Sequence, residues 1–211
     1  MNLHTYWRST SSYRVRIALA LKGIEARHVF VHLVRNGGEQ NAEAYRSINP
    51  QGRVPALELD DGAVLVQSPA IIEYLEEIRP SPPLLPLDPV ARAKVRSVAA
   101  IIGCDIHPLH NVATLNYLRR TFGRSEDDIA QWIGHWITAG FEAVEAMISN
   151  EGYCFGASPG LADVYLVPQV YAATRFNVPM AAFPKIERVT ELCSTHPAFR
   201  QASPSNQDDA E

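Results

Sequence analysis

The amino-acid sequence predicts an α+β N-terminal domain followed by an all-α C-terminal domain. Strand-like and helix-like segments alternate over residues 1–78, as in a domain that packs helices on a sheet. Beyond them, apolar residues recur almost entirely at helical spacing. Between the two parts, residues 78–94 (IRPSPPLLPLDPVARAK) are rich in proline, which removes backbone donors and interrupts helices. We therefore predict a linker there, with domains over residues 1–81 and 88–211.

Residue type predicts the elements of the first part. Runs of β-branched and aromatic residues indicate strands, which we expect over residues 3–7, 28–34, 54–59 and 64–66. Good helix formers indicate helices, which we expect over residues 13–21, 41–47 and 68–78. The resulting order is βαβαββα. That order resembles the thioredoxin-like fold.

Local signals set the ends of these elements. Ser11 and Ser12 are N-cap candidates for the first helix, and Gly23 closes it. The turn at residues 60–62 (Asp-Asp-Gly) favours a hairpin between the last two strands. Ser68 is expected to cap the third helix, with Pro69 at its first helical position.

The second part carries almost no strand signal. We expect helices over residues 91–118, 127–149, 161–176 and 183–193, and a shorter one after Pro197. The last residues (SPSNQDDAE) are polar and acidic, so we expect them to fray.

Bulk properties exclude several classes of partner. A formal net charge of −4 provides no basic field for nucleic acid, and no apolar run is long enough for a membrane span. The start, MNLHTYW, lacks the features of a signal peptide. Three widely spaced cysteines form no CxxC pair, which is typical of a reducing compartment. We expect a cytoplasmic protein without nucleic-acid or membrane partners.

A cluster of four hydroxyls precedes the first helix, in residues 6–23 (YWRSTSSYRVRIALALKG). A helix N-terminus has free N–H groups and a partial positive charge. One hydroxyl is enough for a cap, so Ser9, Thr10, Ser11 and Ser12 also fit a site for a phosphate, a carboxylate or a thiolate. Simple capping is the alternative. A serine nucleophile is disfavoured, because no GxSxG motif and no neighbouring base accompany the cluster.

Two further stretches suggest ligand-binding backbone. In residues 52–57 (GRVPAL) a proline opens a strand, which marks either a sheet edge or a cis bond that exposes the N–H and C=O of Val54 to a peptide-like ligand. In residues 66–77 (VQSPAIIEYLEE), Gln67 and Ser68 stand at a second helix N-terminus, which suits a carboxylate.

These stretches together resemble the zeta class of glutathione transferases, over nearly the whole chain. Residues 8–23 (RSTSSYRVRIALALKG) resemble the serine-rich signature of that class, and NPQGRVPAL and QSPAIIEYLEE resemble its glutathione-binding strand and helix. Residues 103–111 (GCDIHPLHN) and 161–178 (LADVYLVPQVYAATRFNV) resemble its helical domain. The resemblance implies the glutathione transferase architecture, glutathione as cofactor and a homodimer.

The activity that the resemblance implies is cis–trans isomerisation of a maleyl keto acid in aromatic catabolism. The substrate would be maleylacetoacetate, from tyrosine, or maleylpyruvate, from gentisate. A thiolate that adds to the double bond leaves a single bond that can rotate, and its departure gives the fumaryl product. The protein must lower the pKa of the thiol and hold a dicarboxylate.

The resemblance assigns roles to ten residues. Ser9 is expected to bind the glutathione sulfur, with Ser11 as its backup, and Arg8 and Arg175 to grip the substrate carboxylates. The remaining six are expected to bind glutathione: Gln40, Val54, Pro55, Gln67, Ser68 and His107.

Three positions depart from the pattern of the class. Ser11 stands where the signature usually has cysteine, and Tyr13 where it usually has tryptophan. Gly160 stands where the helix that carries Asp163 usually has a serine or threonine cap, for which we expect a small stability cost. Because an isomerase takes its thiolate from glutathione, the loss of the cysteine bears more on conjugation and oxygenation of halogenated acids.

Other interpretations of the sequence remain. A general glutathione transferase would need an apolar acceptor pocket, and a non-catalytic binding module would lack the hydroxyl that stabilises the thiolate. Cys104, His107 and His110 recur every third residue, but Pro108 lies among them and no fourth ligand follows, so we expect no metal. Trp132 and Trp136 are expected to pack within a helix, and Arg14 and Arg16 to lie at the surface with packed stems.

Overall fold

A computed structural model describes residues 1–211, which form two compact units. Unit 1 contains residues 1–83 and 195–211, and unit 2 contains residues 84–194. The division falls inside the proline-rich segment where the linker was predicted. The C-terminal residues group with unit 1, unlike the predicted division into 1–81 and 88–211, because the last helix packs on the first. The boundaries of independently folding domains stay a prediction.

Unit 1 is built on a four-stranded mixed sheet. Its strands are β1 (Asn2–Thr5), β2 (Arg27–Phe30), β3 (Ala56–Glu58) and β4 (Val64–Val66), in the order β2-β1-β3-β4. β1 is parallel to β2, whereas β3 is antiparallel to both β1 and β4. The helices that separate the strands are α1 (Thr10–Lys22), α2 (Glu43–Arg46) and α3 (Ser68–Ile78). The predicted order βαβαββα is confirmed.

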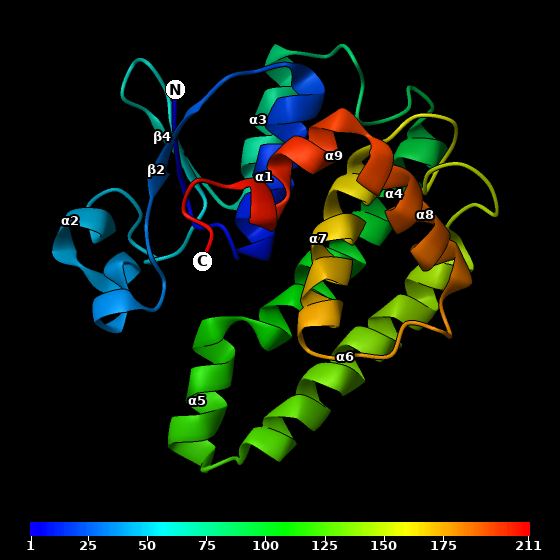
Figure 1. The fold of residues 1–211 in the computed structure, drawn as a ribbon. Helices are drawn as coiled ribbons and strands as arrows, with labels where there is room; N and C mark the ends of the chain where they lie inside the picture. Colours follow the sequence, from blue (N-terminus) through cyan, green and yellow to red (C-terminus); the bar gives the residue numbers. More distant parts are fainter. The chain divides into compact units, whose positions relative to one another are not determined.

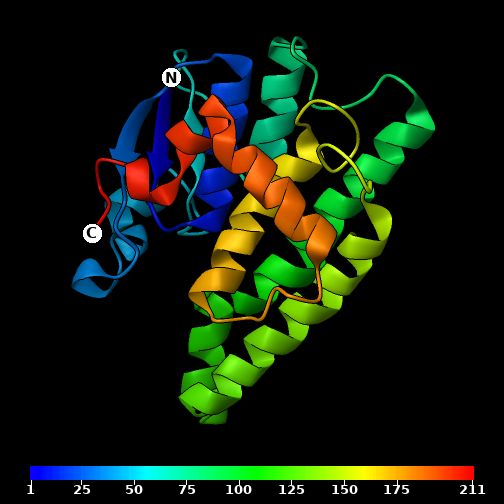
Figure 2. The same cartoon turned by 45° about the vertical axis from the view of Figure 1, so that its right-hand side comes forward.

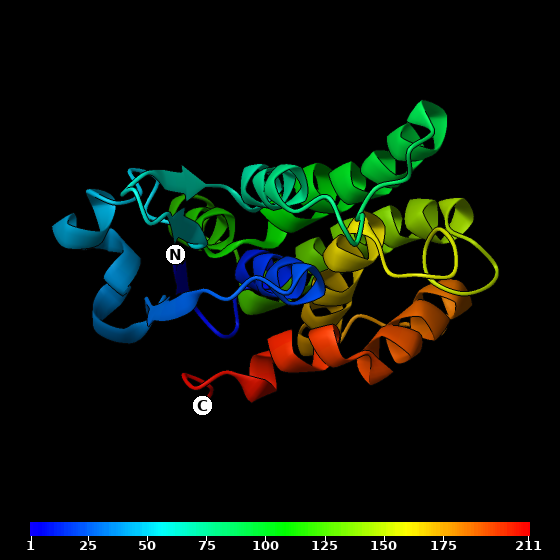
Figure 3. The same ribbon diagram turned by 90° about the horizontal axis from the view of Figure 1, so that it is seen from above.

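Helices cover both faces of this sheet. α1 and α3 lie side by side on one face, and α2 lies beyond the other (Figure 1). The view from above shows the same pairing of α1 with α3 (Figure 3). A buried ion pair between Lys22 and Glu76 joins the ends of the two helices, and Lys22 also donates to the Pro82 carbonyl over 2.5 Å. The pair satisfies a charge that burial would otherwise make costly.

Gly23 closes α1 as predicted, but both predicted N-caps in unit 1 are wrong by one or more residues. α1 is capped by Ser9, whose hydroxyl accepts a hydrogen bond from the Ser12 N–H, so Ser11 and Ser12 lie inside the helix. α3 begins at Ser68, and its N-cap is Gln67 at φ +72° and ψ 119°. In both cases the cap is the last residue with non-helical backbone angles. The position of a serine in the sequence does not determine where those angles end.

The C-terminal residues do not fray, which contradicts the expectation from their composition. α9 (Pro197–Ala202) packs on α1 (Figure 2). A 3-10 turn (Pro204–Asn206) follows, and the buried Gln207 side chain donates to the carbonyls of Gln201 and Ser203. Polar composition suggested fraying, but here polar side chains satisfy backbone carbonyls.

Unit 2 is all helical. Its helices are α4 (Pro89–Ala100), α5 (Val112–Phe122), α6 (Glu126–Met147), α7 (Leu161–Arg175) and α8 (Pro184–Thr195). α8 ends at Thr195, the first residue that groups with unit 1. No helix is both long enough and apolar enough to cross a membrane.

The single helix predicted over residues 91–118 is wrong. After α4 the chain continues through a π-helical turn (Ile101–Ile106) and a 3-10 turn (His107–His110), and α5 starts anew with Asn111 as its cap. Pro108 lacks the N–H of a regular helix. The π-helical turn lies close to α6, where a side chain at Gly140 would approach Ile106 to 2.3 Å.

Asp163 anchors the start of α7. Its carboxylate accepts hydrogen bonds from the Gly160 N–H at 2.8 Å and from the Cys154 N–H at 2.9 Å. The residue is 1% exposed. Burial raises the pKa of the Asp163 carboxyl, although the two N–H donors act in the opposite direction. Gly160 supplies no side chain to the cap, so this carboxylate is the side chain that orders the helix start.

We predict that Asp163→Ala lowers the free energy of unfolding by about 3–5 kcal/mol, because it leaves the buried Cys154 N–H and the half-buried Gly160 N–H without acceptors. Asp163→Asn, which keeps one acceptor oxygen, should cost about 1–3 kcal/mol. Asp127→Ala, at an exposed residue in the first turn of α6, is the control and should change stability by about 0.5 kcal/mol at most. Urea unfolding measures all three. Equal stabilities for the Asp163 and Asp127 variants would contradict the role of Asp163.

Candidate active site

The hydroxyl cluster separates into two buried and two half-buried groups. Thr10 and Ser12 are buried, whereas Ser9 and Ser11 are only partly covered and lie 3.2 Å apart, hydroxyl to hydroxyl. As cap and second helical residue, they stand at the end of α1 where the N–H groups point. The structure therefore brings Ser9 and Ser11 together at a positive helix end.

Hydrogen-bond directions distinguish Ser9 from Ser11. A serine hydroxyl has one hydrogen, and Ser11 donates its hydrogen to the Val54 carbonyl over 3.0 Å. Ser9 only accepts from the backbone, through the Ser12 N–H at 3.2 Å. Its hydrogen is directed at the Ser11 oxygen and is committed to no backbone group. Of the two, Ser9 is the hydroxyl that can donate to an anion without breaking a contact to the backbone.

The Val54–Pro55 segment forms the second part of the site. The peptide bond between the two residues is cis, as in the second interpretation of the GRVPAL pattern, but the Val54 carbonyl already accepts the Ser11 hydroxyl. The carbonyl of the preceding residue, Arg53, accepts hydrogen bonds from the Tyr45 hydroxyl and the Asn49 amide, both at 2.7 Å. The Val54 N–H finds no acceptor within the chain. The segment therefore presents a backbone donor beside the Ser11 hydroxyl.

Gln67 and Ser68 lie at the start of α3. Gln67 has a positive φ, which is uncommon for a residue with a side chain, and its amide donates to Gln51 over 2.5 Å. Ser68 is buried at the first helical position. This is the second helix N-terminus expected from the sequence, with α3 N–H groups directed outward.

Gln40 lies in a short 3-10 turn (Glu39–Asn41) before α2. Its amide nitrogen is 3.4 Å from the Leu33 carbonyl, and its amide oxygen is buried with no donor in the chain. A buried oxygen without a donor costs free energy, so this position favours a ligand that supplies an N–H.

Arg8 is exposed and stacks its guanidinium on the Trp7 ring, 4.5 Å from the ring centroid. In unit 2, Arg175 ends α7, is also exposed, and lies 4.6 Å from the Phe176 ring centroid. Stacking on an aromatic face orients a guanidinium. Both residues are thus prepared to bind a carboxylate.

The sequence interpretation was wrong for Arg14 and Arg16, which are buried rather than surface residues. The Arg16 guanidinium donates to Thr5, Tyr6 and Trp7 within the segment that leads into the hydroxyl cluster. Helical spacing alone places Arg16 on the helix body. Tertiary packing places this side of α1 against a turn of the chain whose carbonyls need donors.

In unit 2, sequence reasoning missed the pairing of His110 with Gln169. His110 is 4% exposed and Gln169 is fully buried, and their side chains lie within hydrogen-bond distance. The His110 ring also contacts the rings of His107 and Phe176. A glutamine inside the apolar run LADVYLVPQVY was the available signal. No three histidine, cysteine or acidic side chains gather in a way that could hold a metal ion.

Comparison with known proteins identifies the family. The glutathione S-transferase N-terminal domain family matches residues 8–78. The maleylacetoacetate isomerase of Pseudomonas aeruginosa is 61% identical over 209 residues, which cover 99% of this chain and 98% of that protein. The chain belongs to the zeta class of glutathione transferases.

Solved structures agree with this assignment. A holo maleylpyruvate isomerase, described as a bacterial zeta-class glutathione S-transferase, is 49% identical, with a TM-score of 0.96 and complete coverage of both chains. The maleylacetoacetate isomerase of Methylobacterium extorquens AM1, solved with malonate and glutathione, is 36% identical over both complete chains, with a TM-score of 0.94. The predicted glutathione transferase architecture is confirmed.

The residues of unit 1 fit glutathione as a ligand. The Val54 N–H and the Gln40 oxygen lack partners in the chain, and a tripeptide supplies both acceptors and donors. Two helix N-termini lie at Ser9 and Ser68, and glutathione carries carboxylates and an ionisable thiol that such ends favour. The observed donor and acceptor set therefore matches the chemistry of this cofactor.

We predict that the pH dependence of stability reports on the buried Tyr45 hydroxyl, which holds the Arg53 carbonyl. Burial raises the pKa of Tyr45 to about 12 from 10.0, so the folded state keeps a proton that the unfolded chain releases. This contribution is complete below pH 10.0 and is lost as the pH rises towards about 12. The free energy of unfolding of the wild type should fall more steeply across that window than that of Tyr45→Phe. Parallel curves from urea unfolding would contradict the buried, neutral phenol.

Proposed function

We propose that this protein is a glutathione-dependent cis–trans isomerase that converts a maleyl keto acid to its fumaryl isomer. The observation that carries the proposal is the Ser9 hydroxyl, which has a hydrogen to donate at the N-terminus of α1, next to the exposed Arg8. Zeta-class relatives with these activities support it. The site joins a group that favours a thiolate to one that binds a carboxylate.

Glutathione is the cofactor that the family uses, and residues of unit 1 would hold it. We assign the Val54 backbone to the cysteine part of the tripeptide. Gln67 and Ser68 would bind the γ-glutamyl carboxylate at the start of α3, and Gln40 the glycine end. We assign Pro55, which follows Val54 through a cis peptide bond, to the same part of the site by resemblance to the family. We also assign His107, in unit 2, to cofactor binding by resemblance to the family.

When bound, glutathione supplies a thiolate that adds reversibly to the maleyl double bond and so permits rotation about it. The protein's part is electrostatic. Ser9 donates a hydrogen bond to the sulfur, and the N-terminus of α1 favours its negative charge, so both lower the pKa of the thiol. Ser11 donates its own hydrogen to the Val54 carbonyl, so its oxygen contacts the Ser9 hydroxyl and orients it.

The two arginines are assigned to the substrate. A maleyl keto acid carries two carboxylates, and a guanidinium binds a carboxylate through two parallel hydrogen bonds. Arg8 would hold one carboxylate next to the thiolate. Arg175 would hold the other, an assignment that rests on the resemblance to the family. A cation near the developing enolate also stabilises its charge.

The rest of the proposal concerns partners and location. The protein is expected to be a cytoplasmic homodimer, which family membership and the three unpaired cysteines support. Maleylacetoacetate and maleylpyruvate differ by one methylene group, and relatives of both kinds are similar to this chain. The rates on the two acids decide between them.

The isomerase assay tests the function. We expect the purified protein to form fumaryl product from one of the two acids only when glutathione is present. Arg8→Ala and Arg175→Ala should each lower kcat/KM about 100-fold, the cost of losing a charged carboxylate contact in a site. Arg27→Ala and Arg120→Ala, at exposed arginines of units 1 and 2, are the matched controls and should change it little.

Other outcomes lead to other functions. Glutathione binding with no isomerisation of either acid, but with conjugation of a small electrophile, would indicate a general transferase. Binding of glutathione without turnover of any substrate would indicate a non-catalytic module. Either outcome rejects the isomerase.

The pKa of the bound thiol tests the assignment of Ser9. We predict that Ser9→Gly raises this pKa by about one unit or more, because the thiolate loses a hydrogen bond, whereas Ser11→Ala raises it less. Glycine is chosen because it caps a helix almost as well as serine, which separates the chemical effect from a loss of stability. Ser9→Thr keeps the hydroxyl and should restore the low pKa. A larger shift for Ser11→Ala, measured by thiolate absorbance against pH, would reverse the assignment.

A further inference from the structure

The segment between β1 and α1 carries the proposed chemistry but has little structure of its own. Residues 6–9 contain Arg8 and Ser9 and lie outside both the strand and the helix. Their internal backbone contact is the hydrogen bond from the Ser9 N–H to the Tyr6 carbonyl, at 3.0 Å. Backbone without a regular partner is free to rotate unless side chains hold it. The direction of Arg8 therefore depends on what binds this segment from outside.

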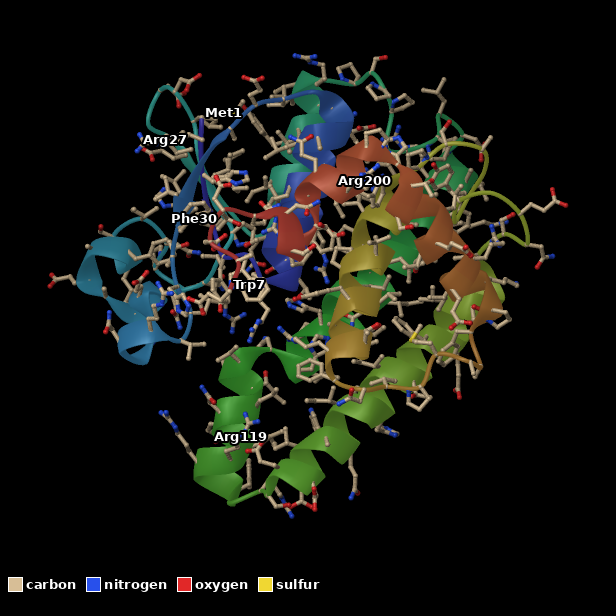
Figure 4. The ribbon with its side chains drawn as sticks, in the orientation of Figure 1. Met1, Trp7, Arg27, Phe30, Arg119 and Arg200 are labelled. Carbon is tan, nitrogen blue, oxygen red and sulfur yellow. The ribbon has the colours of Figure 1, made fainter.

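Two side chains hold the segment. Arg16, which is 3% exposed, donates to the Tyr6 carbonyl at 3.3 Å and to the Trp7 carbonyl at 3.0 Å. Asp209, near the end of the chain, accepts the Trp7 N–H at 3.0 Å. Figure 4 shows Trp7 beside the C-terminal segment. Arg16 thus holds the carbonyls of both peptide groups that flank Trp7, and Asp209 holds the N–H of the first of them.

The C-terminal residues are themselves held in place. Arg16 donates from Nε to the Ala202 carbonyl at 3.0 Å, so one guanidinium contacts both the segment and the end of α9. The Gln207 side chain closes the turn after α9. Beyond Asp209, Glu211 pairs with Arg35 and lies 3.5 Å from the His32 ring. Asp209 is therefore supported on both sides along the chain.

We propose that Asp209 is a positioning residue for the active site, through which the C-terminal residues 203–211 hold the backbone of Trp7 and orient Arg8 and Ser9. This inference rests on the proposed function, since it concerns the same site. Asp209 touches neither substrate nor cofactor in this role. Asp209 acts on Arg8 through the hydrogen bond that it accepts from the N–H of Trp7, the residue before Arg8.

The two oxygens of Asp209 make a discriminating variant available. Oδ2 accepts the Trp7 N–H, whereas Oδ1 is buried and has no donor in the chain. An asparagine can present its oxygen to Trp7 and place its amide nitrogen where Oδ1 lies. Asp209→Asn therefore removes the charge and keeps the hydrogen bond, whereas Asp209→Ala and Asp209→Leu remove both. Leucine keeps most of the volume, in case alanine destabilises the C-terminal residues.

The first measurement is hydrogen exchange at the Trp7 amide in the full-length protein. We expect the amide to exchange at least about tenfold faster in Asp209→Ala and Asp209→Leu, and to stay protected in Asp209→Asn. Asp208→Ala is the matched control, because Asp208 is an exposed neighbour with the same charge, and it should leave the amide protected. Unchanged exchange in both the alanine and the leucine variants of Asp209 would overturn the proposal.

The second measurement is isomerase kinetics with glutathione in excess. Asp209→Ala and Asp209→Leu should lower kcat/KM about tenfold, mainly through a higher KM for the keto acid, since a displaced Arg8 binds the carboxylate less well. Asp209→Asn should restore the value to within about twofold of wild type. Variants of Asp209 that match Asp208→Ala in kcat/KM would reject the positioning role.

The two proposals can fail separately. A wild-type protein without isomerase activity rejects the proposed function. In that case the pKa of bound glutathione still decides on Asp209, because a displaced Ser9 should raise it in the alanine and leucine variants and not in the asparagine variant. If the wild type is active and the Asp209 variants behave like it, only the positioning role of Asp209 is rejected.

Discussion

The start of α1 is the feature on which the rest of the site depends. A helix leaves its first N–H groups without internal partners, and the chain satisfies one of them with the Ser9 hydroxyl. Because the cap is Ser9 and not a later serine, Thr10 and Ser12 turn into the protein, and Ser9 and Ser11 stay partly accessible. The position of the helix start thus determines which hydroxyls are accessible to a ligand and which are buried.

Side chains that hold backbone carbonyls prepare the site around this helix end. Ser11 binds the Val54 carbonyl, and Tyr45 and Asn49 bind the Arg53 carbonyl just before it. Arg16 binds the two carbonyls that precede Arg8. Each donor comes from elsewhere in the chain, and each fixes a loop that has no regular partner. The ligand-binding groups are therefore oriented before a ligand arrives, which reduces the cost of binding.

Local sequence rules predicted much of this protein, and their failures have a common origin. Runs of β-branched and aromatic residues, runs of helix formers, the Asp-Asp-Gly turn and Pro69 in the first turn of α3 were sufficient for the order βαβαββα, which depends on neighbours in the chain. The same rules placed one helix over residues 91–118 and a frayed end after residue 202. In the first, α4 ends at Ala100 and α5 begins only after Asn111, and the second is held by Gln207 and Asp209. Periodicity and composition do not report which carbonyl or N–H a distant side chain will satisfy.

The family, the fold class and the residue types of the site follow from the sequence alone, since hydroxyls before a helix, a proline before a strand and two arginines are local patterns. Which of these groups are available depends on how the chain packs in three dimensions. The packing placed the hydrogen of Ser11 on the Val54 carbonyl and left that of Ser9 without a backbone acceptor. It also turned Arg16 from an expected surface residue into a buried donor, and brought Asp209 to Trp7 across 202 positions of the chain. The physical reason is that a polar group in a protein must find a partner in space, and the sequence does not state where in space its distant parts will lie.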